Sequence, residues 1–101
     1  MAERVGADEY RVLLRHGTMS VGLYTPKEID KQSPHDQDEV YIVASGTGVF
    51  ALGSERMAIG PGDTFFVGAG ARHRFEEFSD DLAVWVVFYG PKGGEHSSGV
   101  G

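Results

Sequence analysis

Cysteine is absent from this sequence of 101 residues, which excludes disulfide bonds, thiolate metal sites and cysteine nucleophiles. Long apolar runs are also missing: none approaches the roughly 20 residues of a membrane-spanning helix, and the first residues lack the apolar core of a signal peptide. Positive charge is scarce, because 9 Lys and Arg stand against 15 Asp and Glu and give a net charge of −6. We therefore expect a soluble, cytoplasmic protein that binds neither nucleic acid nor an anionic membrane.

No stretch of the sequence shows the apolar spacing of a helix. Instead, short runs rich in β-forming residues alternate with turns that contain many of the 15 glycines. This rhythm predicts an all-β barrel or a sandwich of two sheets. We expect one domain over residues 1–101, with an ordered barrel at about 9–89, a flexible arm at 1–8 and a flexible tail at 90–101. The expected strands cover residues 10–14, 19–24, 40–44, 49–52, 55–59, 64–67, 72–78 and 82–89.

A histidine and a carboxylate stand four residues apart at the start of the apolar strand 40–44. Side chains of an extended strand alternate between its faces, so His35 and Glu39 are expected to point the same way. An ionisable pair that faces a small barrel interior is costly unless something satisfies it. The alternative is a loop in which Asp36 or Asp38 caps His35 while Glu39 is solvated, and the residues alone leave both readings open.

A second histidine, His73, follows a glycine-rich turn and lies at the start of the expected strand 72–78. The neighbours of that strand would be the strand of Glu39 and its hairpin. Two imidazoles and one carboxylate suit a divalent first-row metal, such as Fe, Mn, Ni, Co or Zn, with positions left open. The central hypothesis is therefore a metal site formed by His35, Glu39 and His73.

Two polar or aromatic residues share the alternation of Glu39. Gln37 offers an amide oxygen as an extra ligand, although amide oxygen is a poorer ligand than imidazole for these metals and a surface role accounts for it equally well. Tyr41 continues the same face and is a candidate for the pocket wall.

Three residues near the second histidine or in the last strand are further candidates. Glu77 shares the expected face of His73 and is the candidate catalytic residue, as a general base or as an acceptor that orients His73. Phe75 lies on the same face, and Trp85 is selected for its size; both are also explained as core aromatics.

The two histidine stretches resemble the two sequence motifs of the cupin superfamily. The first family motif has two histidines flanking one residue, a glutamate three or four residues later and a glycine seven beyond it. His35, Glu39 and Gly46 match at these offsets, whereas Ser33 stands where the first histidine is expected. In the second motif Gly62, Gly70 and His73 match, whereas Gly68 replaces a proline and Glu77 an asparagine.

The resemblance covers about residues 9–89 and implies a single cupin-type double-stranded β-helix, a jelly-roll barrel. It implies that a divalent metal is bound inside the barrel through His35, Glu39 and His73. Ser33 would weaken such a site and leave an extra position for water or substrate.

Three functions follow as hypotheses. The first is a metalloenzyme of dioxygenase, isomerase or lyase type that acts on a small oxygen-bearing substrate. The second is a non-catalytic small-molecule-binding or sensor barrel, with or without metal, and the third is a structural association module. We also expect a homodimer, because the strands at 40–44 and 82–89 are apolar on both faces and a small domain cannot cover both alone.

Overall fold

The computed structural model describes residues 9–27 and 34–95, and all regular structure in these ranges is β-strand. No helix that is long and apolar enough to cross a membrane occurs in the described ranges. Glycines at the tight turns account for several strand ends, since Gly17 and Gly53 adopt φ values of 59° and 60° between paired strands. The strands are β1 (Tyr10–His16), β2 (Met19–Tyr24), β3 (Asp38–Ser45), β4 (Gly48–Leu52), β5 (Glu55–Ile59), β6 (Thr64–Val67), β7 (His73–Glu76) and β8 (Ala83–Tyr89).

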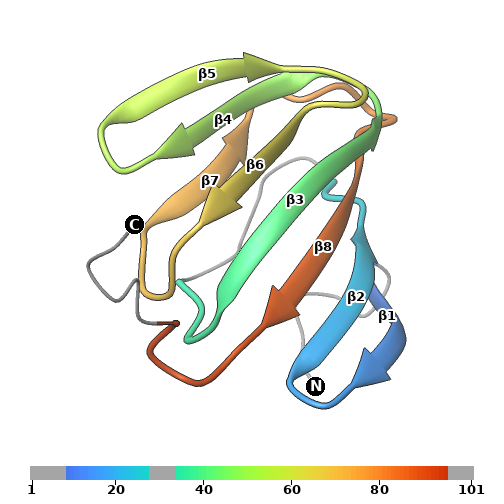
Figure 1. The fold of residues 1–101 in the computed structure, drawn as a ribbon. Helices are drawn as coiled ribbons and strands as arrows, with labels where there is room; N and C mark the ends of the chain where they lie inside the picture. Colours follow the sequence, from blue (N-terminus) through green and yellow to red (C-terminus); the bar gives the residue numbers. More distant parts are fainter. Residues whose placement is uncertain (1–8, 28–33, 96–101) are drawn as a thin grey trace.

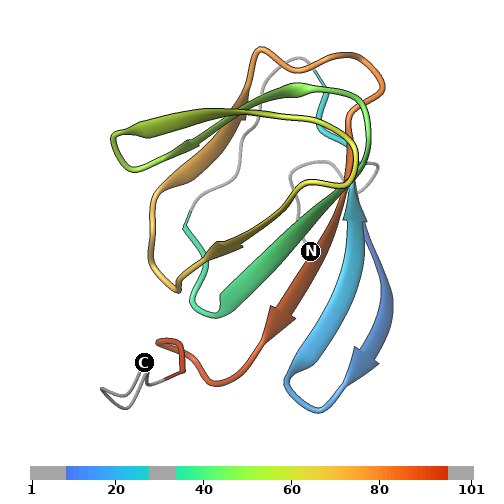
Figure 2. The same ribbon diagram turned by 45° about the horizontal axis from the view of Figure 1, so that its top comes forward.

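The strands form two antiparallel sheets that face each other (Figures 1 and 2). The larger sheet has the order β1-β2-β8-β3-β6, and the smaller one has the order β5-β4-β7. Strands adjacent in a sheet are mostly distant in sequence, as in the pairing of β8 with both β2 and β3. The expectation of an all-β, jelly-roll barrel is confirmed by this arrangement.

The core lies between the sheets and is built from alternate residues of each strand. On β3, Tyr41 and Val43 are buried, and their cross-strand partners Val86 and Val84 on β8 are buried as well. Phe50 on β4 and Phe75 on β7 are paired and fill the interior from the smaller sheet. Burial of these large apolar side chains stabilises the barrel, with about 1.5–3 kcal/mol for each fully buried side chain.

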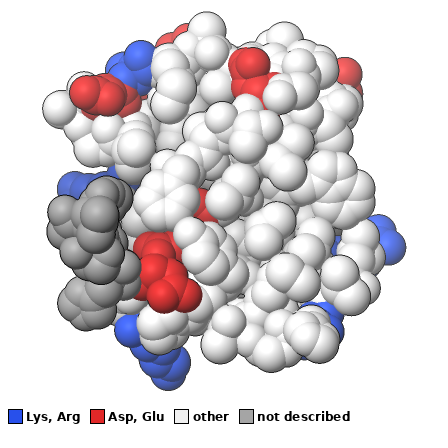
Figure 3. Space-filling model, in the orientation of Figure 1, with Lys and Arg blue, Asp and Glu red and all other residues white. Residues whose placement is uncertain are grey.

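The other face of the larger sheet is also apolar. One row of cross-strand neighbours crosses all five strands, and a second row lies beside it with Leu23, Trp85 and Ile42. Figure 3 shows a broad surface without charged side chains over β8 and β2. Two members of the first row, Leu14 and Phe66, are each 53% exposed. The first row consists of Leu14, Val21, Val87, Val40 and Phe66, and the two rows together are called the outer apolar face below.

The chain after β8 folds back against the start of β3. The carboxylate of Asp38 accepts hydrogen bonds from the backbone N–H of Ala69 at 2.9 Å and of Glu95 at 2.8 Å. The N–H of Gly93 also donates to the carbonyl of Asp36 at 2.7 Å. Residues 90–95, which the sequence assigns to a flexible tail, are thus tied to the segment that carries the first histidine.

Candidate metal centre

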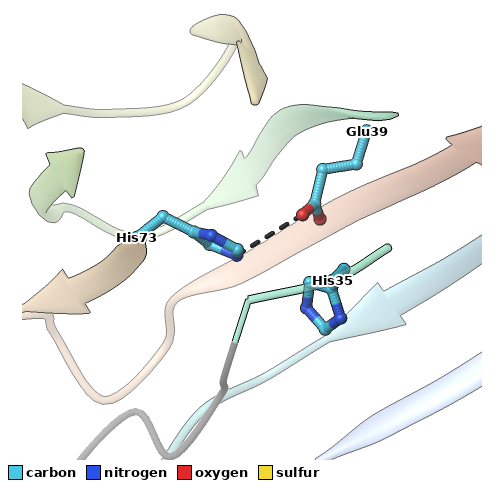
Figure 4. Close-up of side chains that lie close together, drawn as sticks. All are labelled: His35, Glu39 and His73. Carbon is cyan, nitrogen blue, oxygen red and sulfur yellow. Dashed lines mark ion pairs between the residues drawn. The ribbon is translucent and has the colours of Figure 1, made fainter. Parts of the chain in front are cut away.

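Three ionisable side chains from separate parts of the chain converge inside the barrel (Figure 4). His35 precedes β3, Glu39 lies within β3, and His73 begins β7. One nitrogen or oxygen atom of each residue lies within 4.8 Å of the others. The side chains of Glu39 and His73 are each only 1% exposed, so the group lies within the protein rather than on its surface.

Backbone contacts hold the two histidine segments together. The N–H of Gly70 donates to the carbonyl of His35 at 2.7 Å, which joins the turn before His73 to the segment before β3. The neighbouring N–H of Ala69 is fixed by the carboxylate of Asp38, as described above. The glycine-rich turn therefore has a direct role, because it carries the N–H groups that bring His73 beside His35 and Glu39.

The ring of His73 has a defined orientation and tautomer. Its Nδ1 lies 2.9 Å from the carbonyl oxygen of Ala71, and a carbonyl can only accept, so Nδ1 carries the proton in the neutral ring. The other nitrogen, Nε2, then presents its lone pair at 3.4 Å from Oε1 of Glu39. This Nε2 is buried and makes no hydrogen bond to the part of the chain that the structure describes. A lone pair aimed at a carboxylate oxygen is the arrangement that a shared cation satisfies.

Aromatic rings surround the three residues and separate them from the core below. The ring of Phe88 lies 4.9 Å from that of His35, and the rings of Tyr41 and Phe50 lie 5.9 and 6.1 Å from that of His73. Tyr41 was expected at this wall, whereas Phe88 and Phe50 were not. The pairing register of β3 with β8 would have predicted Phe88 at this wall, because Phe88 is the cross-strand partner of Glu39.

Two of the residues expected in the pocket lie elsewhere. Glu77 is not on the face of His73: β7 ends at Glu76, and Glu77 adopts a φ of 49° that breaks the alternation. Its side chain is 73% exposed and pairs with Arg56 at 3.4 Å. Trp85 alternates with the buried Val84 and Val86 and belongs to the outer apolar face, so the expectation of an inward position is wrong for both residues.

The remaining candidates have other surroundings. Gln37 donates its amide N–H groups to the carbonyls of Thr18 at 3.0 Å and Gly90 at 2.9 Å, which ties the β1–β2 turn to the end of β8. Phe75 is buried in the core, with its ring 5.1 Å from that of Tyr41. Ser33 lies outside the described residues.

A hollow of about 370 Å³ lies over β4 and β7 and touches His73. Its wall includes Arg72, Arg74 and Glu76, which alternate away from the buried His73 and Phe75. The hollow therefore lies on the outside of the smaller sheet rather than at the convergence of the three ionisable residues.

Comparison with known proteins gives matches in sequence and in fold. An uncharacterised protein of Streptomyces coelicolor is 44% identical over 94 residues, which is 90% of each chain. The structure of KdgF from Halomonas matches 82% of this chain and 80% of that chain with a TM-score of 0.71 at 16% identity.

The DMSP lyase DddQ of Ruegeria pomeroyi matches 86% of this chain with a TM-score of 0.70 at 22% identity, and this chain spans 51% of its length. These likenesses to solved structures concern the fold. The sequence profile of the cupin domain matches residues 20–89, which include all three converging residues. The chain therefore belongs to the cupin domain family.

Proposed function

We propose that this protein binds one divalent first-row metal ion through His35, Glu39 and His73 and uses the site to bind a small oxygen-bearing organic molecule. The observation that carries the proposal is the position of His73 Nε2, which is buried and lies 3.4 Å from Oε1 of Glu39. A bound metal would act as a Lewis acid on an oxygen of that molecule. With three protein ligands, the remaining positions stay open for the molecule and for water.

The chain's own residues support a ligand of limited size. Below the three ionisable residues, Tyr41 and Phe50 are fully buried with ring centroids 5.6 Å apart, and Phe65 lies 4.5 Å from Phe50. Such packing fills this end of the barrel in the part of the chain that the structure describes. A ligand would therefore reach the metal from the side of His35, which is the least buried of the three.

Metal addition is expected to raise the melting temperature of protein first stripped with a chelator. At a metal concentration 100-fold above Kd, binding to the folded state contributes about 2.7 kcal/mol. For a domain of this size the expected rise is on the order of 10–20 °C. The measurement is a thermal-shift series with Mn, Fe, Co, Ni and Zn, together with elemental analysis of protein purified without chelator. Protein that contains no metal and responds to none of the five would contradict the proposal.

The type of reaction is the finer part of the proposal. We favour a lyase, isomerase or dioxygenase type of chemistry, and the likeness in fold to a protein described as a DMSP lyase supports the first of these. A non-catalytic binding barrel is the alternative, favoured by the exposed position of Glu77, which removes the candidate base from the interior. A ligand that stabilises the metal-loaded protein and is recovered unchanged would favour the alternative.

We also propose that the protein is a homodimer that buries the outer apolar face. Its eight members are uncharged, and they come from all five strands of the larger sheet. An exposed apolar patch of this kind is typical of an association surface. A second copy is the proposed occupant because a two-fold axis through this face would pair the same apolar residues on both sides.

Phe66→Lys is expected to convert the dimer to a monomer. Phe66 is 53% exposed at the edge of the outer apolar face, and a lysine there would bring two like charges into the interface. We expect the dimer Kd to rise by about 10- to 100-fold, which corresponds to about 1.4–2.8 kcal/mol. Analytical ultracentrifugation measures it, with Met57→Lys as control, because Met57 is 42% exposed on the other sheet. A wild-type protein that sediments as a monomer at all concentrations would exclude the dimer.

A further inference from the structure

The link between His35 and Glu39 is held, residue by residue, by the chain that follows β8. Each of its three residues makes a hydrogen bond to residues 90–95, which are called the C-terminal strap below. The three bonds run from the N–H of Gly93 to the carbonyl of Asp36 at 2.7 Å, from the amide of Gln37 to the carbonyl of Gly90 at 2.9 Å, and from the N–H of Glu95 to the carboxylate of Asp38 at 2.8 Å. The C-terminal strap therefore lies along the whole link between two of the proposed metal ligands.

The carboxylate of Asp38 joins the C-terminal strap to the turn before His73. Asp38 is only 5% exposed, and its two oxygens have different partners. Oδ1 accepts from the N–H of Ala69 at 2.9 Å, and Oδ2 accepts from the N–H of Glu95 at 2.8 Å. A buried carboxylate is stable only when hydrogen bonds replace its lost water. If the strap left, water would reach this carboxylate and compete with the bond that fixes Ala69, so the position of the turn depends on the strap.

A glycine allows the C-terminal strap to lie directly against Asp38. Gly94 has a φ of 90°, and a Cβ atom there would fall 2.8 Å from Oδ1 of Asp38 and 3.3 Å from the Cβ of Ala69. Any larger residue at this position would have to move the strap away from the carboxylate. The strap is thus fitted to the surface formed by Asp38 and Ala69.

We infer that Asp38 is a positioning residue of the metal centre, through which docking of the C-terminal strap and metal binding favour each other. The inference rests on the proposed function, because the metal is the ligand whose affinity the strap changes. A metal needs His35 and Glu39 at fixed places relative to His73. The strap holds the link between the first two, and Asp38 with its bond to Ala69 holds the turn that carries the third.

Asp38→Ala tests the positioning role in the full-length protein. The change removes the acceptor for both Ala69 and Glu95, so we expect the Kd for Zn(II), measured by isothermal titration calorimetry, to rise about 10- to 100-fold. Asp36→Ala is the matched control, because it removes an equal charge from an exposed side chain while the bond of Gly93 to its backbone carbonyl remains. The control separates positioning from the general attraction of a cation by nearby carboxylates, and we expect it to leave the Kd much closer to the wild-type value.

Glu95→Pro tests the contribution of the C-terminal strap, because proline has no N–H to donate to Asp38. We expect the Kd for Zn(II) to rise about 10-fold. Glu95→Ala removes the same side chain and keeps the N–H, so its Kd is expected to stay unchanged. Both changes lie beyond the last strand, and circular dichroism is expected to show the folded barrel in each.

Hydrogen exchange of the wild-type protein gives a readout that a merely structural strap would not move. Coupling between two sites is reciprocal, so bound metal must protect the strap by the factor by which the docked strap tightens metal binding. The amides of Gly93 and Glu95, followed by NMR, are therefore expected to exchange about 10-fold more slowly with saturating Zn(II). The amide of Asp63, bonded to the carbonyl of Gly60 in the turn between β5 and β6, is the control and is expected to change less.

The outcomes separate this inference from the proposed function. Unchanged exchange at Gly93 and Glu95 in the Zn(II)-saturated protein overturns the coupling while the metal site stands. Asp38→Ala that binds Zn(II) as tightly as Asp36→Ala, or Glu95→Pro that binds it as tightly as Glu95→Ala, overturns it as well. Failure of the wild-type protein to bind Zn(II) overturns the proposed function and, with it, this inference.

Discussion

Replacement of His73 by alanine is expected to raise the Kd for a divalent metal by at least about 100-fold, since changes around a metal ligand alone cost 10- to 100-fold in affinity. His73 is the ligand with the best-defined geometry, because its Nδ1 is held by the carbonyl of Ala71 and its Nε2 faces Glu39. Isothermal titration calorimetry with Ni(II) or Zn(II) measures the constant. Glu39→Gln, which keeps the shape of the side chain and removes its charge, is expected to give a loss of similar size.

The control for this prediction is His16→Ala. His16 is exposed at the end of β1, so its removal tests whether any histidine of the protein contributes to the measured affinity. His73→Ala also removes ring contacts with Tyr41 and Phe50, and circular dichroism must therefore show that the variant is folded. Folded His73→Ala and Glu39→Gln proteins that bind metal as tightly as the wild type would exclude the site.

Much of the fold could be predicted because turn residues mark the ends of the strands. The segment between Gly62 and Gly68 is the clearest case, since the expected strand at 64–67 is the strand Thr64–Val67 of the structure. The limits 55–59 and 19–24 also agree with β5 and β2. Where no glycine or proline marks the end, prediction was poorer: β7 ends at Glu76 because Glu77 takes a positive φ, and nothing in its residue type signals this.

The faces of the strands were predictable only where polar and apolar residues alternate. Glu39 fixes the parity of β3, so the inward position of Tyr41 followed from the sequence. The last strand contains no polar residue between Leu82 and Tyr89, and its two faces therefore look alike in the sequence. Trp85 was predicted to line the pocket because it is the largest residue of this strand, but the register places Val84 and Val86 inside and Trp85 outside. Pairing with β3 determines the parity, and pairing is a property of the fold.

The three residues of the site come together partly through closeness in the sequence and partly through the fold. His35 and Glu39 are near each other in the sequence, and their spacing indicated a common ligand. The approach of His73 depends on backbone contacts such as that between Gly70 N–H and the His35 carbonyl, which sequence spacing alone does not predict.

Gly46→Ala is expected to destabilise the protein by about 3 kcal/mol, from the strain of a left-handed backbone and from overpacking. Gly46 has a φ of 82°, and a Cβ there would lie 2.5 Å from the Cα and 2.6 Å from the N of Leu82. Both contacts are with backbone atoms, which cannot move aside as the end of a flexible side chain can. At about 4–8 °C per kcal/mol, the melting temperature is expected to fall by about 12–24 °C.

Gly53→Ala is the matched control, because it introduces the strain of a left-handed backbone without the steric clash that a Cβ at position 46 would cause. Gly53 has a φ of 60°, but a Cβ at this position would meet no atom within 4 Å. Its replacement is expected to cost only the backbone term of about 1–2 kcal/mol. Equal losses for the two variants would show that contact with Leu82 contributes nothing. A larger loss for Gly46→Ala would give the motif glycine a structural reason: it lets the end of β3 pass directly against the backbone before β8 and so holds the strand that carries Glu39 in register.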